Sequence, residues 1–378
     1  MDLGRTTVLA LVAALAVTTA AAGAIYALVP STTPPTGVAR VVEPSPAAST
    51  VEPNTLDAIP SGTLDPAALP ERTIDRALLV VSTWDATPES MTLLGVDAAT
   101  EEWVRVVVPG RSATTLDLGS TLALAPDGRS LLVSSWEEGA EFEIVSLATG
   151  AARPVSPQLT DEDCQADAAA WAPDGQHLGI VVSCATYTDP ETLLSDLASW
   201  VIEVDMRTGA QRTLDHVIGY GPYETYPSYS PDGRYVAYGV WKEGDDEDAS
   251  GGIRTVDTTT GRGHVWPDSH MTYGDPWQDA RTLVGWDLLP DPGSGAEYTL
   301  IDAATETSAP LGMAGLFNLN GHVAGHLVID RTPWVDGEIP CAVTYCLTDP
   351  DSRETSPWLE TPGSVQLGFL SPARSLLR

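Results

Sequence analysis

Residues 230–234 read Ser-Pro-Asp-Gly-Arg, and this stretch decides the fold because close copies of it recur along the chain. Two plain copies are Ala-Pro-Asp-Gly-Arg at residues 125–129 and Ala-Pro-Asp-Gly-Gln at residues 172–176. In such a stretch proline presets φ at the first turn position, aspartate bonds its own backbone, and glycine tolerates a positive φ. The copies therefore predict three tight turns, each joining two β-strands.

Three weaker copies extend the series to six turns. They are residues 277–281, 318–322 and 371–375. The turn aspartate, or the residue in its place, falls at positions 127, 174, 232, 279, 320 and 373. The intervals of 47, 58, 47, 41 and 53 residues are close to the roughly 40–50 residues of a four-stranded propeller blade.

A third strand that ends in a polar turn is expected in each repeat, followed by a fourth, outer strand. Examples of such third strands are residues 142–147, 201–205, 253–257 and 298–302. The composition also favours an all-β protein, since 33 glycines and 30 prolines interrupt the short apolar runs.

The repeat resembles that of the TolB-type propellers, relatives of the WD-repeat propellers, in which a Ser-Pro-Asp-Gly-Lys/Arg turn joins the first two strands of a blade. The resemblance covers roughly residues 73–378. It implies an all-β propeller, and it says little about function because this fold carries many activities.

The two ends of the repeat region complement one another. Residues 77–108 supply only the last three strands of a blade, and residues 364–370 supply an orphan first strand. Pairing these two segments closes the ring and leaves no exposed edge. We therefore expect a single propeller of six four-stranded blades, although a strand within residues 60–76 would give seven blades or an irregular ring.

The start of the chain predicts a membrane segment. Arg5 precedes 24 residues without charge, 6–29, and a helix of this length spans a hydrocarbon core of about 30 Å. Arg5 favours an N-terminus in the cytoplasm and a single-pass protein with its propeller outside. The small residues at positions 20–24 leave cleavage as a signal peptide, and hence secretion, as the alternative.

A segment rich in Pro, Ser and Thr follows, residues 30–70, which we expect to be an extended linker. The expected organisation is thus a membrane or signal segment at 1–29, a linker at 30–70 and the propeller at 71–378. The formal net charge of −33 argues against nucleic acid as a partner, because such a chain repels phosphate backbones.

The four cysteines suit disulfides in an oxidising compartment. Cys164 and Cys184 lie ten residues before and after the turn residue Asp174, so a hairpin folded there places them opposite one another. Cys341 and Cys346 then pair by elimination. That second bond requires a turn within residues 342–345, because an extended strand would hold the two cysteines about 16 Å apart.

Catalytic signatures are missing from the sequence. There is no Gly-x-Ser-x-Gly elbow, His-Glu-x-x-His helix, phosphate loop or dinucleotide fingerprint. We therefore expect no catalytic residue, no cofactor and no metal.

Tryptophan followed by carboxylates ends the second strand of most blades, at the loops that all emerge on one face of a propeller. These tryptophans are Trp84, Trp136, Trp241, Trp286 and Trp334, with Asp85 and Asp287 directly after two of them. Loops between blades add Tyr223 and Tyr273 on the same face, with the histidines His216, His264 and His270. These tryptophans are either packing residues between blades or a recognition face that stacks on sugars or peptides.

Two hypotheses about function follow. The first is a membrane-tethered, non-enzymatic module that binds a protein, a peptide or an envelope glycan. The second is a propeller enzyme of the lyase, lactonase or glycosidase type, with its site at the channel mouth.

Overall fold

The computed structural model divides the chain into two units, Met1–Ala48 and Ser49–Arg378. The structure describes residues 58–84, 91–112, 116, 122–134, 142–159, 164–189, 194–222, 227–242, 250–272, 274–288, 296–315, 317–331, 341, 343–362 and 365–377, all in the second unit. The expected membrane segment, residues 6–29, lies outside this part. Within it, no helix has the length and apolar character needed to cross a bilayer.

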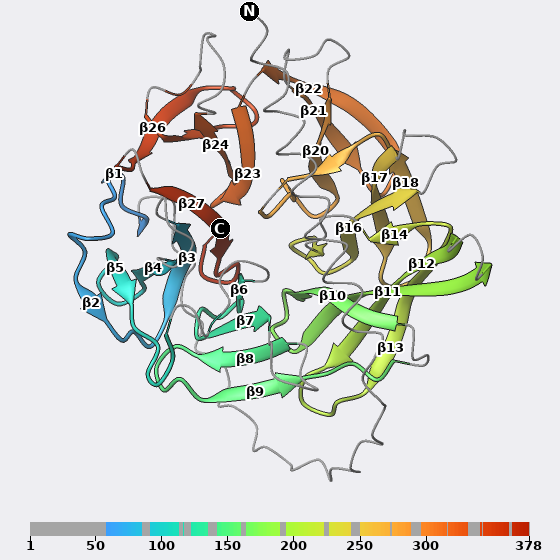
Figure 1. Ribbon diagram of the computed structural model, residues 1–378. Helices are drawn as coiled ribbons and strands as arrows, with labels where there is room; N and C mark the ends of the chain where they lie inside the picture. Colours follow the sequence, from blue (N-terminus) through green and yellow to red (C-terminus); the bar gives the residue numbers. More distant parts are fainter. Residues whose placement is uncertain are drawn as a thin grey trace, which may run out of the picture. The chain divides into compact units, whose positions relative to one another are not determined.

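Six β-sheets form the six blades of a β-propeller, arranged around a centre near which the C-terminus lies (Figure 1). Blade 1 consists of β27 (Gln366–Pro372), β3 (Ala77–Trp84), β4 (Thr92–Asp97) and β5 (Glu102–Val106). Blade 2 consists of β6 (Leu122–Leu124), β7 (Ser130–Ser134), β8 (Phe142–Ser146) and β9 (Ala152–Val155). Blade 3 consists of β10 (Cys164–Trp171), β11 (His177–Asp189), β12 (Leu194–Asp205) and β13 (Gln211–Ile218).

Blades 4 to 6 follow the same plan, with the inner strand of blade 4 divided in two. Blade 4 consists of β14 (Gly221–Pro222), β15 (Ser228–Tyr229), β16 (Tyr235–Lys242), β17 (Ser250–Asp257) and β18 (Gly263–Pro267). Blade 5 consists of β19 (His270–Met271), β20 (Thr282–Leu288), β21 (Ala296–Asp302) and β22 (Thr307–Gly315). Blade 6 consists of β23 (Phe317–Val323), β24 (His326–Arg331), β25 (Tyr345–Thr348) and β26 (Thr355–Glu360). The predicted six-bladed propeller is confirmed.

The repeated Pro-Asp-Gly turns have the geometry that their residue types predict. In blade 4 the Oδ1 atom of Asp232 accepts a hydrogen bond from the backbone N–H of Arg234 at 3.0 Å. Gly233 has a φ of 75°, which glycine adopts without a steric penalty. In blade 2, Gly128 also meets blade 1, since a Cβ on it would lie 2.2 Å from the carbonyl oxygen of Ala77. The turn thus fixes both the hairpin and the contact between neighbouring blades.

The weak copy at residues 318–322 is not a turn, and the prediction there is wrong. These residues lie inside β23, where the register with β24 shifts between Leu319 and His322. The chain reverses later, at Ala324 and Gly325, which have φ values of 47° and 79°. The bulge at residues 320–321 packs on the blade 5 segment at residues 274–275, so its glycine serves a close contact between blades.

The ring closes as predicted, by pairing the two ends of the repeat region. Strand β27 pairs antiparallel with β3, with Leu370 opposite Val81 and Pro372 opposite Leu79. The chain after β27 buries Leu376 and Leu377 against the core of the first blade. No separate inner strand for blade 1 is therefore needed from the N-terminal side.

The last part of the predicted linker and the two residues after it, 58–72, add short strands to the outer edges of two blades. Strand β1 (Gly62–Thr63) pairs parallel with β26, and β2 (Glu71–Arg72) pairs parallel with β5. Leu64 is 1% exposed, so this segment does bury apolar surface. The two short strands add a fifth strand to blades 6 and 1, and the ring keeps six blades.

Candidate functional site

The structure describes three of the side chains that the sequence predicts to bind ligand, namely Trp241, Trp286 and Asp287. The others lie outside the described part of the chain: Trp136, Trp334, Asp85, Tyr223, Tyr273 and the side chain of Trp84. Trp241 and Trp286 lie on the second strands of neighbouring blades, β16 and β20, and both are half-buried. They occupy corresponding strands, as the repeat predicts.

Trp286 has contacts typical of a packing residue. Its indole Nε1 donates a hydrogen bond to the carbonyl oxygen of Met271 at 2.9 Å. Its ring stacks on His270 with centroids 4.4 Å apart and an interplanar angle of 24°. The neighbouring Asp287 accepts from the hydroxyl of Thr299 at 3.4 Å. One ring face and the only donor of this tryptophan are therefore engaged within blade 5.

Replacing Trp286 tests whether it packs or binds. Trp286→Ala should lower the free energy of unfolding by about 2–3 kcal/mol, somewhat less than the roughly 3–5 kcal/mol of a fully buried tryptophan. Trp286→Phe retains an aromatic ring against His270 and should cost about half as much, since it loses chiefly the hydrogen bond to Met271. Urea denaturation measures both. An alanine variant as stable as the unchanged protein would instead favour a recognition role.

The three histidines predicted near this face each contact a tryptophan of their own. His216 stacks on Trp200 with centroids 3.8 Å apart, and His264 lies 4.4 Å from Trp266 at a tilt of 56°. With the His270–Trp286 pair, these contacts belong to blades 3, 4 and 5. Within the described part of the chain, no three His, Cys, Asp or Glu residues are grouped so that they could hold a metal ion.

The centre of the ring is bridged by Arg374, which follows the inner strand of blade 1. Its guanidinium donates to the carbonyl oxygen of Tyr229, to the hydroxyl of Ser228 at 2.8 Å, and to the carboxylate of Asp275. The side chains of Arg374 and Asp275 are only 21% and 11% exposed. Blade 1 is thus tied to blades 4 and 5 across the axis. A cavity of about 90 Å³ lies beside this contact.

His322 adds a buried titratable group to this network. Its Nδ1 lies 2.9 Å from the carbonyl oxygen of Asp275, so Nδ1 carries the proton and donates. The side chain is almost fully buried, and this burial lowers the pKa of His322, although the charge of Asp275 and the hydrogen bond to its backbone act in the opposite direction. Histidine is therefore neutral here at neutral pH.

The buried neutral state of His322 predicts a pH-dependent stability. Below about pH 6.5, the ordinary pKa of histidine, the unfolded chain binds a proton that the folded protein resists, so the free energy of unfolding should fall. Above that pH both states are neutral at this position, and His322 contributes no pH dependence. Between about pH 7 and pH 5, the free energy of unfolding should therefore fall less in the His322→Gln variant than in the unchanged protein. The difference should be at most roughly 1.4 kcal/mol for each pH unit. Equal losses in urea titrations at the two pH values would contradict this assignment.

A larger cleft lies on blade 3, on the side that faces blade 2. Its volume is about 250 Å³. Its lining comes from the segment after β9 and from all four strands of blade 3: Gln158, Leu159, Cys164, Val182, Cys184, Trp200, Ile202, Gln211, Arg212 and Thr213. Because β9 has only four residues, the irregular segment after it forms the wall opposite blade 3.

The strand register explains why these side chains share one face of blade 3. Trp200 is directly opposite Val182 on one side and His216 on the other, and residues opposite one another point to the same face of a sheet. Cys164 is likewise opposite Cys184. The disulfide and the half-buried indole of Trp200 therefore stand side by side in the cleft.

The sequence reasoning missed Trp200, which lies in mid-strand and not at a strand end. A usable signal was present. Trp200 and His216 lie eight residues on either side of Thr208, in the turn between β12 and β13, just as the two cysteines flank Asp174. Applied to this second turn, the same symmetry would have paired the tryptophan with the histidine.

Arg212 is the one charged residue in the described lining of the cleft, and it is paired with Glu203, although its side chain is 57% exposed. Its Nε donates to Glu203 at 2.7 Å and its Nη1 to the carbonyl oxygen of Thr258 in blade 4 at 3.3 Å. The hydrogen bond to Glu203 raises the pKa of Arg212. The other polar side chains of the described lining are the amides of Gln158 and Gln211 and the hydroxyl of Thr213, which carry no charge.

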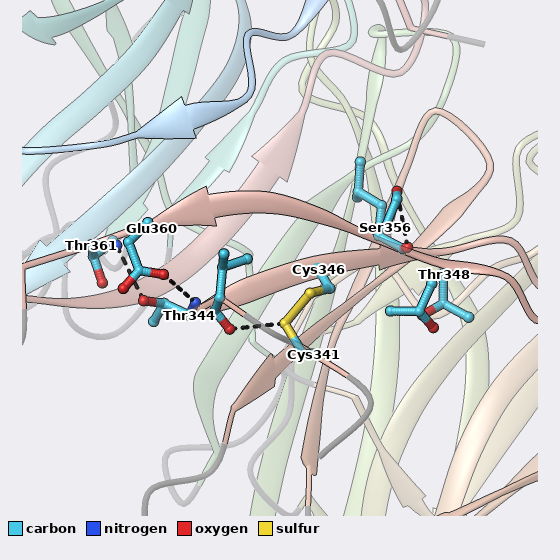
Figure 2. Close-up of a disulfide and its surroundings, with 10 residues drawn as sticks. Cys341, Thr344, Cys346, Thr348, Ser356, Glu360 and Thr361 are labelled. Atoms are coloured by element: carbon cyan, nitrogen blue, oxygen red, sulfur yellow. Dashed lines mark hydrogen bonds between the residues drawn. A yellow bond between two sulfur atoms is a disulfide. The ribbon is translucent and has the colours of Figure 1, made fainter. Parts of the chain in front are cut away.

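Both expected disulfides are present. Cys164 and Cys184 have their Cα atoms 4.1 Å apart, and those of Cys341 and Cys346 are 5.5 Å apart. Figure 2 shows the second pair beside the compact bend before β25, where the backbone N–H of Thr344 donates to Glu360 at 3.0 Å. This bend is the turn that the short spacing of the second pair requires.

The two disulfides should differ in their effect on stability. Replacing Cys164 and Cys184 together with alanine should cost about 3 kcal/mol, and the same change at Cys341 and Cys346 about 2 kcal/mol, because the first bond closes the longer loop. Thermal denaturation compares the two double variants. Mass mapping of a non-reduced digest should find both linked peptide pairs, and free thiols at any of the four positions would refute the pairing.

No family model matches the sequence, and the search of curated proteins finds no match. Among solved structures, a putative TolB from Agrobacterium tumefaciens is 14% identical, and the match covers 78% of this chain and 98% of that one with a TM-score of 0.40. An oligogalacturonate lyase in complex with manganese is 14% identical over 75% of this chain and 73% of that one, with a TM-score of 0.45. The β-propeller domain of the Trilobed protease from Pyrococcus furiosus is 11% identical over 76% and 81%, with a TM-score of 0.41. These similarities concern the propeller fold and carry no functional argument.

Proposed function

We propose that this protein is a non-enzymatic binding module, held outside the cytoplasm by residues 6–29 or secreted if that segment is cleaved. The observation that carries the proposal is the blade 3 cleft, which presents a half-buried indole, Trp200, in a space of about 250 Å³. A concave site lined by aromatic and apolar groups with a few polar ones is the usual form of a ligand pocket. Its ligand is a protein, a peptide or an envelope glycan.

The centre of the ring offers less support for the alternative, an enzyme with its site at the channel mouth. The charged groups there are bound to one another, since Arg374 neutralises Asp275 and also occupies Ser228. The axial cavity of about 90 Å³ is also much smaller than the cleft. A catalytic site needs groups that are free to meet a substrate.

A binding screen tests the proposal directly. The full-length protein, purified in detergent, should retain members of a peptide array or a glycan array without converting them. Trp200→Ala should weaken that binding at least tenfold, while Trp241→Ala, on the second strand of blade 4, should leave it unchanged. If only Trp241→Ala abolished binding, the binding site would lie on the predicted tryptophan face and not in the cleft. Chemical conversion of a ligand would refute the non-enzymatic role.

A further inference from the structure

We infer that the blade 3 cleft binds a neutral pyranose unit of a glycan, an inference that rests on the binding function proposed above. The cleft combines a fixed aromatic plane, uncharged hydrogen-bonding groups and a small volume. Each of these three features comes from residues that the structure describes. Each reduces the range of ligands that would fit the cleft.

The aromatic plane is the indole of Trp200. His216 covers one of its faces, with ring centroids 3.8 Å apart and an interplanar angle of 22°, and His216 lies outside the lining of the cleft. His216 therefore restricts the orientation of the indole, which is itself part of the cleft lining. A flat, rigid, apolar plane of this kind fits the C–H face of a pyranose ring, and its rigidity lowers the entropy lost on binding.

The hydrogen-bonding groups match hydroxyls better than charges. The side-chain amides of Gln158 and Gln211 and the hydroxyl of Thr213 can each both donate and accept, as sugar hydroxyls do. The backbone N–H of Gln158 donates to the Oε1 of Gln211 at 3.1 Å, which fixes that amide at the wall. The one charged residue of the described lining, Arg212, is paired with Glu203 and also donates to the carbonyl oxygen of Thr258.

The charge of the whole chain disfavours an acidic ligand. With a formal net charge of −33, the protein repels uronate or phosphate polymers, and the one cation in the described lining, Arg212, is already paired with Glu203. A sulfate, phosphate or uronate group would have to compete with Glu203 for Arg212. Among glycans, neutral ones remain.

The size of the cleft favours one ring over an extended chain. Its volume of about 250 Å³ lies just below the roughly 300–1,000 Å³ of pockets that enclose drug-sized ligands. The disulfide between Cys164 and Cys184 forms part of the wall and stiffens it. Opening the disulfide should therefore weaken binding without removing any group that hydrogen-bonds the sugar.

Calorimetric titration of the full-length protein tests this inference. The probes are maltohexaose, cellohexaose and mannohexaose as neutral glycans, hexagalacturonate as the acidic counterpart, and the peptides retained by the array. We expect binding of at least one neutral hexasaccharide with an affinity that changes less than twofold between low and high salt, because no ion pair forms. The tryptophan fluorescence should change on binding.

Variants assign the binding to the cleft and separate the two proposals. Trp200→Ala should reduce the affinity at least tenfold, Trp200→Phe less than Trp200→Ala, and Trp241→Ala not at all, with thermal denaturation showing that each variant folds. Binding of only hexagalacturonate or a peptide, lost with Trp200→Ala, would overturn the neutral-glycan inference and leave the binding function standing. Binding of no probe at all would overturn both.

Discussion

Deleting residues 364–378 should leave little or no folded protein. The deletion removes β27, so the backbone of β3 loses its antiparallel partner and blade 1 acquires an open edge. It also removes the buried side chains of Leu370, Leu376 and Leu377. At about 1.5–3 kcal/mol for each buried leucine, the loss is roughly 5–9 kcal/mol, comparable with the whole stability of a typical domain.

Circular dichroism during heating measures this effect. Deletion of Arg378 alone is the control, because it leaves β27 intact, and it should keep the melting temperature unchanged. Adding a synthetic peptide of residues 364–378 to the truncated protein should restore part of the folded signal. A truncated protein that melts at the temperature of the full chain would show that the ring does not depend on its closing strand.

Breaking the Arg374–Asp275 pair should have the second largest effect. Both side chains are mostly buried, so Arg374→Met leaves the carboxylate of Asp275 without its cation, and the loss should be about 3–5 kcal/mol. Asp275→Asn should cost a similar amount for the converse reason. The double variant should cost at least about 1 kcal/mol less than the two single changes together, because neither charge is then left alone.

An exposed ion pair provides the matched control. Arg72 and Glu102 lie 3.1 Å apart on the outer edge of blade 1, with side chains 41% and 59% exposed. Arg72→Met should therefore cost well under about 1 kcal/mol. Urea denaturation of all four variants gives the comparison. If Arg374→Met were as mild as Arg72→Met, the contact across the axis would have no structural importance.

The fold could be predicted because its signals are local. Pro-Asp-Gly turns such as residues 230–234 form because of φ preferences and hydrogen bonds from side chain to backbone. Both depend only on the few residues of the turn itself. The closure by β27 was also predictable, since residues 77–108 lack a first strand. The disulfide between Cys164 and Cys184 followed from symmetry about a turn.

What the sequence could not reveal depends on contacts between blades. Asn320 and Gly321 are residue types typical of a turn, but they form a bulge that packs on Gly274 of the neighbouring blade. Arg374 gave no sign that it would reach Asp275, a residue 99 positions away. The cleft itself is formed where a short outer strand of one blade leaves a face of the next uncovered, which no motif records.

The pairing of β27 with β3 also fixes when the protein can be completed during its synthesis. Leu79 and Pro372 are paired although they lie 293 positions apart in the chain. At translation rates of about 5–20 residues per second, the first blade waits roughly 15–60 s for its inner strand. A chain that ends early therefore keeps an unpaired strand edge, by which proteases and chaperones can distinguish it from the finished product.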